Sequence, residues 1–199
     1  MSLLRNRITI AMIAALVTLA PATAQARGRT AQRVVAMKAS DCAGADLVPT
    51  PANLGAIRSA TLCPLNVERT QRGRSALRSN GDLGRAAGPY AQAMVDFGFF
   101  AHVSPDGTTF VARIKRTAYL ARSSGWALGE NLAWGEAELG SPASIVDAWM
   151  RSAEHKRNIL DGRYVEIGVG IAYGTPSGGQ EQGATYATEF GTRSLIARA

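Results

Sequence analysis

The sequence predicts an α+β domain in which helices come first and an antiparallel hairpin comes last. Apolar residues recur at intervals of three and four over 54–97 and again over 141–152, which is the period of an amphipathic helix. From residue 165 the period changes to two, as in a half-buried strand. Strands and helices do not alternate along the chain, so a parallel sheet of repeated strand–helix–strand units is not expected.

The first two helices are predicted over 54–65 and 81–97. The pattern of the first is interrupted by Pro64, so we expect a kink there or a new helix start at Cys63–Pro64. The second has one clear apolar stripe, and Gly98 follows it at the position where glycine commonly ends a helix.

A third helix is predicted from Ser141, which has the side chain of an N-cap, with Pro142 at the first helical position. This helix buries Trp149 and its apolar neighbours, whereas Asp147 and Arg151 form an exposed pair four residues apart.

The C-terminal third predicts a long-looped antiparallel hairpin. Apolar residues alternate over 165–173 and again over 186–190, and a polar, glycine-rich loop lies between them. Gly168 and Gly170 fall on one face of the first strand, which suggests that a helix approaches the strand closely at that face.

The composition fits one folded domain with a short appendage. The chain has 199 residues, of which 46% are hydrophobic and 19% are charged, and its formal net charge is +7. These values exclude a disordered chain. Two cysteines are too few for a disulfide-built miniprotein or a four-cysteine zinc site.

The first 26 residues predict a secretory signal peptide. Arg5 and Arg7 precede an apolar run over 8–19, and small residues at A-x-A spacing end at Ala26. The run is too short to span a bilayer comfortably, and no later segment approaches spanning length. We expect cleavage after Ala26 and a secreted protein, extracellular or periplasmic; an uncleaved anchor is the alternative.

Export to an oxidising compartment predicts one disulfide. Cys42 and Cys63 are the only cysteines, so a single pairing exists. Closing a loop of about 20 residues is worth about 3 kcal/mol in the chain-entropy model. Two free thiols are the alternative.

Residues 27–52 predict a basic extended arm ahead of a folded domain over 53–199. The arm is poor in apolar residues and contains Pro49 and Pro51. The stretch 27–85 holds ten basic and four acidic residues, which suits a solvated face or contact with anionic envelope polymers. The basic residues are not interleaved with aromatics, so nucleic acid is not an expected partner.

Two histidines and one acid are the candidates for chemistry. His102 lies between a helix end and a Pro-Asp-Gly turn, Glu130 precedes a strand-like run, and His155 follows the third helix. Together they suit a zinc site with an open position or an acid–base pair. On composition alone the favoured interpretation is three separate structural residues, because no His-Glu-x-x-His motif joins them.

Several short motifs, taken in order, resemble the bacterial branch of the CAP superfamily of cysteine-rich secretory, antigen 5 and pathogenesis-related proteins. The resemblance covers about residues 57–191 and implies a three-layer α–β–α sandwich with a central antiparallel sheet. The motifs are Leu65-Asn66-x-x-Arg69, Gly98-Phe-Phe-x-His102-x-Ser-Pro-Asp-Gly107, Arg113-Ile114, Gly129-Glu130-Asn131, Trp149-Met-x-Ser152-x-x-His155-x-x-Asn158-Ile159-Leu160 and Ile167-Gly-Val-Gly170.

The resemblance implies a cavity lined by two histidines and two glutamates that sometimes holds a divalent metal such as zinc. His102, Glu130 and His155 match three of these positions, but Ser152 occupies the place of the second acid. Asn131 and Asn158 are expected to support the cavity by bonding backbone groups.

The resemblance does not determine an activity, because fold does not imply function. Lipid binding recurs in the superfamily, so we expect a secreted, non-enzymatic binding module for a lipid or sterol-like molecule or a cell-envelope partner. One alternative is a metal-dependent hydrolase or peptidase that uses His102, Glu130 and His155. A second alternative is an electrostatic binder of anionic envelope polymers.

Overall fold

The computed structural model describes residues 37–38, 41–177 and 183–196. The predicted signal peptide over 1–26 lies outside these residues, as do 27–36 and 39–40 of the predicted arm. In the described part of the chain no helix is long and apolar enough to cross a membrane.

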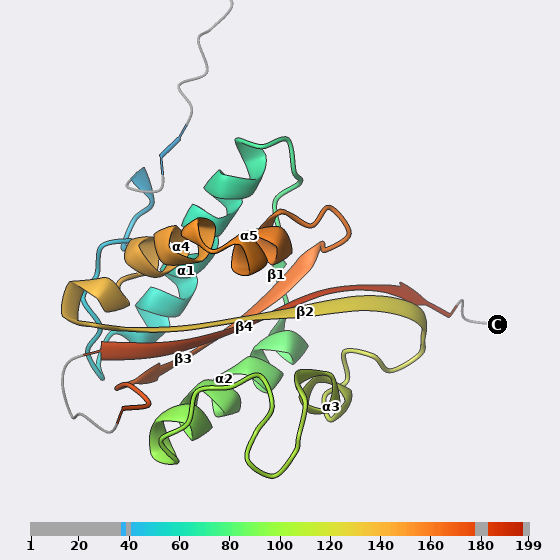
Figure 1. The fold of residues 1–199 in the computed structure, drawn as a ribbon. Helices are drawn as coiled ribbons and strands as arrows, with labels where there is room; N and C mark the ends of the chain where they lie inside the picture. The colour runs from blue at the N-terminus through green and yellow to red at the C-terminus, as the bar shows by residue number, and fades with distance from the viewer. Residues whose placement is uncertain (1–36, 39–40, 178–182, 197–199) are drawn as a thin grey trace, which may run out of the picture. The chain divides into compact units, whose positions relative to one another are not determined.

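A four-stranded sheet forms the middle layer, with helices on both faces (Figure 1). The strands lie in the order β1-β3-β4-β2; β3 and β2 pair antiparallel with β4, and the short β1 pairs parallel with β3. One face is covered by α1, α4 and α5, and the other by α2 and α3. The predicted α+β class and three-layer sandwich are therefore confirmed. The helices are α1 (Leu54–Thr70), α2 (Gly81–Asp96), α3 (Phe110–Lys115), α4 (Pro142–Arg151) and α5 (Ala153–Leu160), and the strands are β1 (Arg78–Ser79), β2 (Ser123–Glu136), β3 (Glu166–Tyr173) and β4 (Gly183–Leu195).

The ends of α2 and α4 follow the predicted capping chemistry. The Asn80 side chain accepts hydrogen bonds from two backbone N–H groups in the first turn of α2. After α2, Gly98 has φ of 63°, and the N–H of Phe99 donates to the carbonyl of Met94 over 3.1 Å, which closes the helix end. Ser141 caps α4 as predicted.

Helix α1 differs from its prediction, because it continues through Pro64 instead of restarting there. Proline removes one backbone donor and is usually excluded from a helix interior. Here the Pro64 ring is buried, as is Leu65 beside it. Burial of this apolar face against the rest of the domain outweighs the free-energy cost of a proline inside the helix. The residue pattern of one segment cannot reveal such packing against distant residues.

The glycines of β3 bring α2 onto the sheet, as predicted. A Cβ on Gly168 would collide with the backbone of Leu83, and a Cβ on Gly170 would collide with the backbone of Ala87. Both collisions are with helix backbone, which cannot move aside as a side chain can. The two glycines therefore set the distance between α2 and the sheet.

Both faces of the sheet are buried, and successive residues of β4 alternate between them. Tyr186 and Phe190 belong to the apolar cluster under α1 and α4, where Trp149 meets Tyr186 edge-on at 6.3 Å between ring centroids. Ala187 belongs to the cluster under α2 together with Tyr90. A charged residue of β4 on the side of Ala187 must therefore be buried, which becomes important at the site below.

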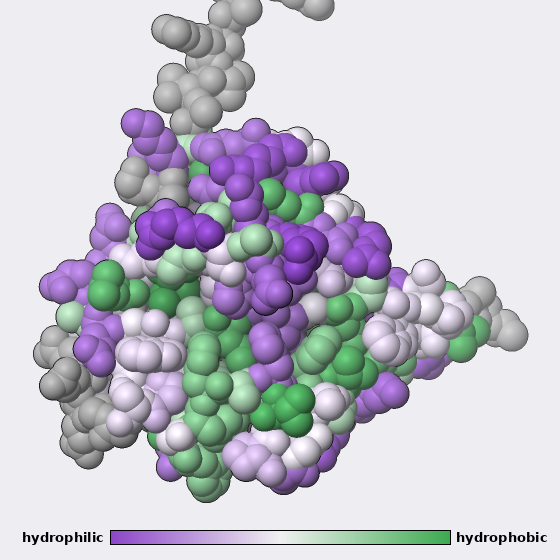
Figure 2. Space-filling view, in the orientation of Figure 1, coloured by the Kyte–Doolittle hydropathy of each residue, from purple (hydrophilic) through white to green (hydrophobic). Residues whose placement is uncertain are grey.

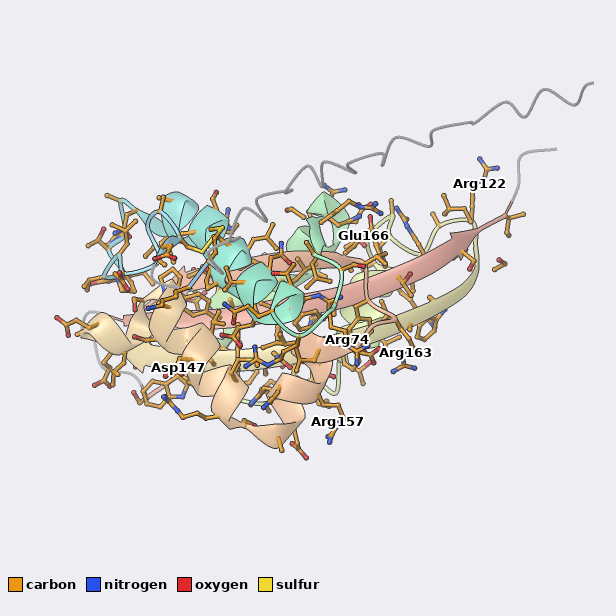
Figure 3. All side chains as sticks on the ribbon, turned by 90° about the horizontal axis from the view of Figure 1, so that it is seen from above. Arg74, Arg122, Asp147, Arg157, Arg163 and Glu166 are labelled. Atoms are coloured by element: carbon orange, nitrogen blue, oxygen red, sulfur yellow. A yellow bond between two sulfur atoms is a disulfide. The ribbon has the colours of Figure 1, made fainter. Side chains whose placement is uncertain are left out.

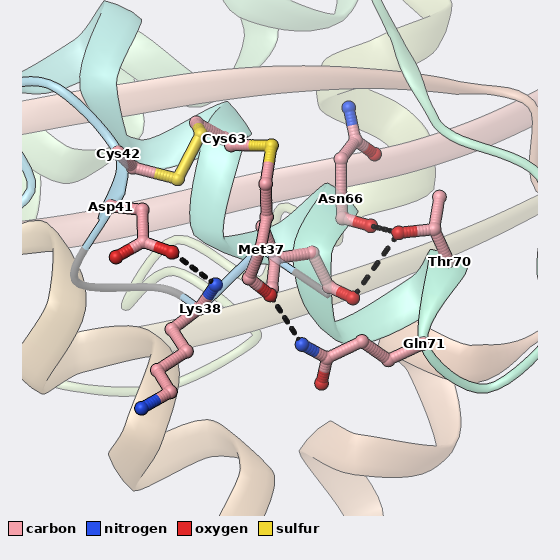
Figure 4. The surroundings of a disulfide bond; sticks show 9 residues. Met37, Lys38, Asp41, Cys42, Cys63, Asn66, Thr70 and Gln71 are labelled. Carbon is pink, nitrogen blue, oxygen red and sulfur yellow. Dashed lines mark hydrogen bonds between the residues drawn. A yellow bond between two sulfur atoms is a disulfide. The ribbon is translucent and has the colours of Figure 1, made fainter. Parts of the chain in front are cut away.

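The predicted disulfide between Cys42 and Cys63 is present and ties the segment before α1 to that helix (Figure 4). The two Cα atoms lie 5.8 Å apart, and the cysteines are 21 residues apart in the chain. Ala45 is buried, and its carbonyl accepts a hydrogen bond from the N–H of Ala143 at the start of α4. The segment from Asp41 thus contacts the domain, whereas the sequence predicts an extended arm as far as residue 52.

Replacing both Cys42 and Cys63 with serine is expected to lower the free energy of unfolding by about 3 kcal/mol. The chain-entropy model attributes this loss to the loop that the bond closes in the unfolded state. Urea unfolding under oxidising conditions measures the difference, and the wild type with a reductant should match the double variant. An unchanged midpoint would contradict the expectation.

Candidate functional site

His102 and Glu130 meet in the structure, as the resemblance implies. His102 Nδ1 lies 2.7 Å from Glu130 Oε1. The loop that carries His102 closes in a turn in which the N–H of Gly107 donates to the carbonyl of Ser104 over 2.8 Å, with Gly107 at φ of 82°. The hydroxyl of Tyr90 in α2 donates to the carbonyl of Ala101, which holds the loop from its other side.

Arg113 of α3 binds the second oxygen of the same carboxylate. Its Nη2 contacts Glu130 Oε2, and its guanidinium carbon lies 3.2 Å from the centroid of the Tyr90 ring. Its Nη1 also donates to the carbonyl of Thr108 over 3.2 Å. Only 8% of the Arg113 side chain is exposed, so this ion pair is nearly removed from water. No role was predicted for Arg113 from the sequence.

Glu189 is a second buried acid at the site, and it was missed among the residues predicted from the sequence. It lies directly across the β2–β4 pair from Glu130, and its side chain is fully buried. Burial raises the pKa of the Glu189 carboxyl well above its ordinary value, the negative charge and hydrogen bond of Glu130 raise it further, and Arg113 lowers it. Arg113 Nη2 is 3.9 Å from Glu189 Oε1, which is too long for a hydrogen bond.

The surroundings of Glu189 disfavour its ionised form. As a carboxylate it would have no hydrogen-bond donor for either oxygen among the described residues. Protonation of Glu189 would leave Arg113 beside one carboxylate, that of Glu130, instead of two. The sequence did contain a signal for Glu189. It is a charged residue in a predicted strand, and a three-layer sandwich buries both faces of such a strand.

His155 lies near His102, but no hydrogen bond joins its ring to Glu130 among the described residues. Burial lowers the pKa of the His155 imidazole, the charge of His102 lowers it further, and Glu154 raises it. His102 shifts in the opposite direction, because its hydrogen bond to Glu130 raises its pKa. The two imidazoles are therefore close enough to influence each other, and their pKa values shift in opposite directions.

The asparagines support the cleft by bonding backbone and each other, as predicted. Asn131 Nδ2 donates to the carbonyl of His155 over 3.1 Å, and Asn158 Nδ2 donates to the carbonyl of Glu130 over 3.1 Å and to Asn131 Oδ1 over 2.9 Å. These bonds join α5 to β2 and fix the backbone of both site residues. Ser152 precedes α5 at its N-cap, and its side chain makes no capping hydrogen bond.

Three alternate carbonyls along the edge strand β2 accept hydrogen bonds from side chains. The acceptors are Leu128, Glu130 and Leu132, and the respective donors are the Tyr164 hydroxyl, Asn158 Nδ2 and Trp149 Nε1. An edge strand otherwise offers unpaired backbone groups to other chains. These side-chain hydrogen bonds therefore reduce the tendency of β2, which carries Glu130, to pair with a strand of another molecule.

The trio of His102, Glu130 and His155 does not fit a three-ligand metal site in this arrangement. Both oxygens of Glu130 are engaged, one by His102 and one by Arg113. Over residues 37–38, 41–177 and 183–196, no three His, Cys, Asp or Glu side chains are grouped so that they could hold a metal ion. We therefore derive no step that passes through a metal.

Replacing Glu189 with glutamine is expected to stabilise the protein increasingly as the pH rises. A raised carboxyl pKa in the folded state means that the folded protein binds the proton more tightly than the unfolded chain. Wild-type stability is therefore lost as the pH rises above the ordinary carboxyl pKa, and glutamine, an uncharged donor of similar shape, avoids this loss.

We expect little difference near pH 4 and a gain for Glu189→Gln that grows toward pH 8. Urea unfolding at both pH values measures it. A variant less stable than wild type at pH 8 would show that Glu189 is ionised in the folded protein.

Comparisons with known proteins give the family and the fold. The profile of the cysteine-rich secretory protein family (CAP) matches residues 63–188, a range that contains His102, Glu130 and His155. The uncharacterized protein YkwD of Bacillus subtilis (strain 168) is 30% identical over 120 residues, which are 60% of this chain and 44% of that protein. The chain thus spans less than half of this relative's length.

Two solved structures share the fold. An extracellular protein containing a SCP domain from Bacillus anthracis aligns with a TM-score of 0.57 and 21% identity, over 71% of this chain and 43% of the other. An outer surface protein from Borrelia burgdorferi aligns with a TM-score of 0.57 and 21% identity, over 74% of this chain and 97% of the other.

Proposed function

Because the chain belongs to the cysteine-rich secretory protein (CAP) family, we propose that it is an exported, non-enzymatic binding module for a lipid-like small molecule or a cell-envelope component. Export is supported by the signal-peptide pattern of the first 26 residues. It is also supported by the extracellular and outer-surface proteins that share the fold.

One observation carries the non-enzymatic part of this proposal: Glu130 has no free oxygen. A general base must reach the proton that it removes, but the Glu130 carboxylate is held by His102 on one oxygen and by Arg113 on the other. Among the described residues no serine, threonine or lysine side chain hydrogen-bonds to the ring of either histidine. The cluster therefore supports the loop and the strand more directly than it supports hydrolysis.

The surface around His102 is suited to an apolar partner. The His102 side chain is 56% exposed, and Phe100 and Val103 beside it are exposed as well. On the face shown in Figure 2, hydrophilic residues gather over α4 and α5, and hydrophobic residues gather lower, over the strands and α2. An exposed apolar area rimmed by polar residues is typical of an interaction surface.

The basic segment gives little support to the electrostatic alternative. Arg69 is fully buried, and Arg72 and Arg85 form ion pairs with Glu68 and Asp82. Arg74 projects near Arg163 (Figure 3), and Arg163 is paired with Asp161. Three of the basic residues of this segment, Arg69, Arg72 and Arg85, are thus already buried or paired in the fold.

Native mass spectrometry of the exported protein, purified without detergent, tests the proposal. We expect a bound small molecule that survives purification and exchanges with added lipid. Peptide and ester substrates, assayed with and without zinc, should show no turnover above a His102→Ala/His155→Ala double variant. Zinc-dependent turnover that the double variant loses would overturn the proposal, as would a wild type that carries and exchanges no ligand.

A further inference from the structure

A hollow of about 700 Å³ lies between the C-terminal end of β2 and helix α4. None of the described residues that line it belongs to the cluster of His102, Glu130 and Arg113. Its apolar part is formed by Trp134, which is 40% exposed, and Leu139, which is 70% exposed. Large apolar side chains that are left in water singly need no explanation, but two of them in one hollow are typical of a binding site.

The backbone is strained where it brings Leu139 to this hollow. After Glu136 the chain enters the short 3₁₀ helix η2 (Ala137–Gly140). Ala137 begins this helix with φ of 46°, in the left-handed region that favours glycine. The helix folds back on β2, since a Cβ on Gly135 would collide with the carbonyl of Leu139. A strained backbone that holds an apolar side chain in water is costly, and a ligand site gives a reason for it.

Polar side chains with both donors and acceptors border the same hollow. Asp147 and Arg151 form an ion pair one turn apart on α4, and both are exposed, so each keeps hydrogen-bonding capacity toward a ligand. Figure 3 shows Asp147 on this helix. Glu136 and Ser144 also line the hollow. Carboxylates accept and a guanidinium donates, so together these groups can bind hydroxyl groups, which do both.

The charges of the hollow narrow the class of ligand. Glu136, Asp147 and Arg151 carry one net negative charge, which disfavours a carboxylate or a phosphate. A lipid chain would leave these charged groups without hydrogen bonds. Cations such as choline are held by cages of several aromatic rings, whereas Trp134 is the one aromatic residue among the described residues that line the hollow.

We propose that this hollow binds a neutral glycan, with one pyranose ring stacked on Trp134 and its hydroxyl groups hydrogen-bonded to Asp147 and Arg151. The C–H groups on one face of a pyranose suit the electron-rich face of the indole ring, and its equatorial hydroxyl groups reach the polar rim. The inference rests on the proposed binding function and names a sugar polymer as the cell-envelope component.

The probes are cellotriose and triacetylchitotriose, two neutral sugar trimers, and binding to the full exported chain is measured by isothermal titration. We expect one site on the wild type for at least one trimer. Trp134→Ala should weaken binding by about tenfold or more, because the stacking surface is lost. The matched control is Trp126→Ala, an exposed tryptophan of the same strand that lies outside the hollow, and it should bind as the wild type does. Both side chains are exposed, so we expect both variants to fold.

The polar rim is tested separately. Asp147→Ala should weaken binding by about two- to tenfold, the range of one or two hydrogen bonds. Glu68→Ala breaks a pair of the same spacing, with Arg72 on α1 outside the hollow, and should leave binding unchanged. Raising the salt from about 0.05 M to about 0.5 M should also leave the affinity unchanged, because the ligand carries no charge.

The outcomes separate this inference from the proposed function. Equal binding of a trimer to the wild type and to Trp134→Ala would overturn the hollow as the site. A wild type that binds neither trimer, or that binds choline in a salt-sensitive way instead, would overturn the ligand class. In each case a ligand carried in native mass spectrometry would leave the binding function standing. Loss of binding in Trp134→Ala, but not in Trp126→Ala, together with the effect of Asp147→Ala, would establish the site.

Discussion

The Arg69→Ala variant is expected to lose at least about 4 kcal/mol of unfolding free energy, because it leaves several buried carbonyls without a donor. The Arg69 side chain donates to the carbonyls of Ser75, Ile159, Asp161 and Tyr164, over 2.6–3.0 Å. It thereby fixes the loop after α1 and the turn between α5 and β3. Burial lowers the pKa of Arg69, neighbouring Arg74 lowers it further, and Asp161 raises it.

Urea unfolding followed by circular dichroism measures this loss. Arg69→Lys should recover only part of it, because an ammonium group cannot reproduce the planar fork of the guanidinium. Arg72→Ala is the matched control on the same helix, and it should cost less than about 1 kcal/mol because its pair with Glu68 is partly exposed. Equal losses for Arg69→Ala and Arg72→Ala would contradict the role assigned to Arg69.

The Arg113→Met variant is expected to lose about 3–5 kcal/mol, the cost of breaking a buried ion pair from one side. Methionine keeps much of the apolar stem of Arg113 against Tyr90 but leaves Glu130 without its cation. The backbone carbonyl of Thr108 loses a donor as well. Arg116→Met, an exposed arginine just after the same helix, is the control and should change stability little.

The loss in Arg113→Met should grow with pH. Arg113 lowers the pKa of Glu189 in the wild type, so its removal raises that pKa further. A folded carboxyl with a raised pKa loses stability as the pH rises above the ordinary carboxyl value. Wild type and variant lose this stability in parallel until the pH passes the raised pKa of Glu189 in the wild type, so the difference between them, measured by urea unfolding, should stay constant in acid and grow only at alkaline pH. A difference independent of pH would show that Arg113 does not act on Glu189.

Local periodicity was sufficient to predict the elements that frame the site. The stripe of α2, the cap at Ser141 and the alternation of β3 and β4 each depend on residues near one another in the chain, and the structure has them as predicted. A restart at Pro64, one of the two predicted alternatives, does not occur, because the helix continues through this proline with the ring buried.

The site was predicted only in part, because half of it depends on strand register. His102 and Glu130 were found through motifs, and the structure joins them. Glu189 faces Glu130 only because β2 and β4 pair in one register, and Arg113 reaches both only because α3 docks below them. Neither contact can be predicted from the periodicity of the sequence. The charge of Glu189, in a strand buried on both faces, was the one feature that indicated a role for it.

His102 and Arg113 hold both oxygens of Glu130, so that this acid is a fixed anchor and not a free base. Titration of the His102 ring by nuclear magnetic resonance, in the wild type and in Glu130→Gln, tests it most directly. We predict a His102 pKa above the ordinary value of about 6.5 in the wild type, and a fall toward that value in Glu130→Gln, while His155 titrates below it. A His102 pKa that does not change in Glu130→Gln would contradict the claim.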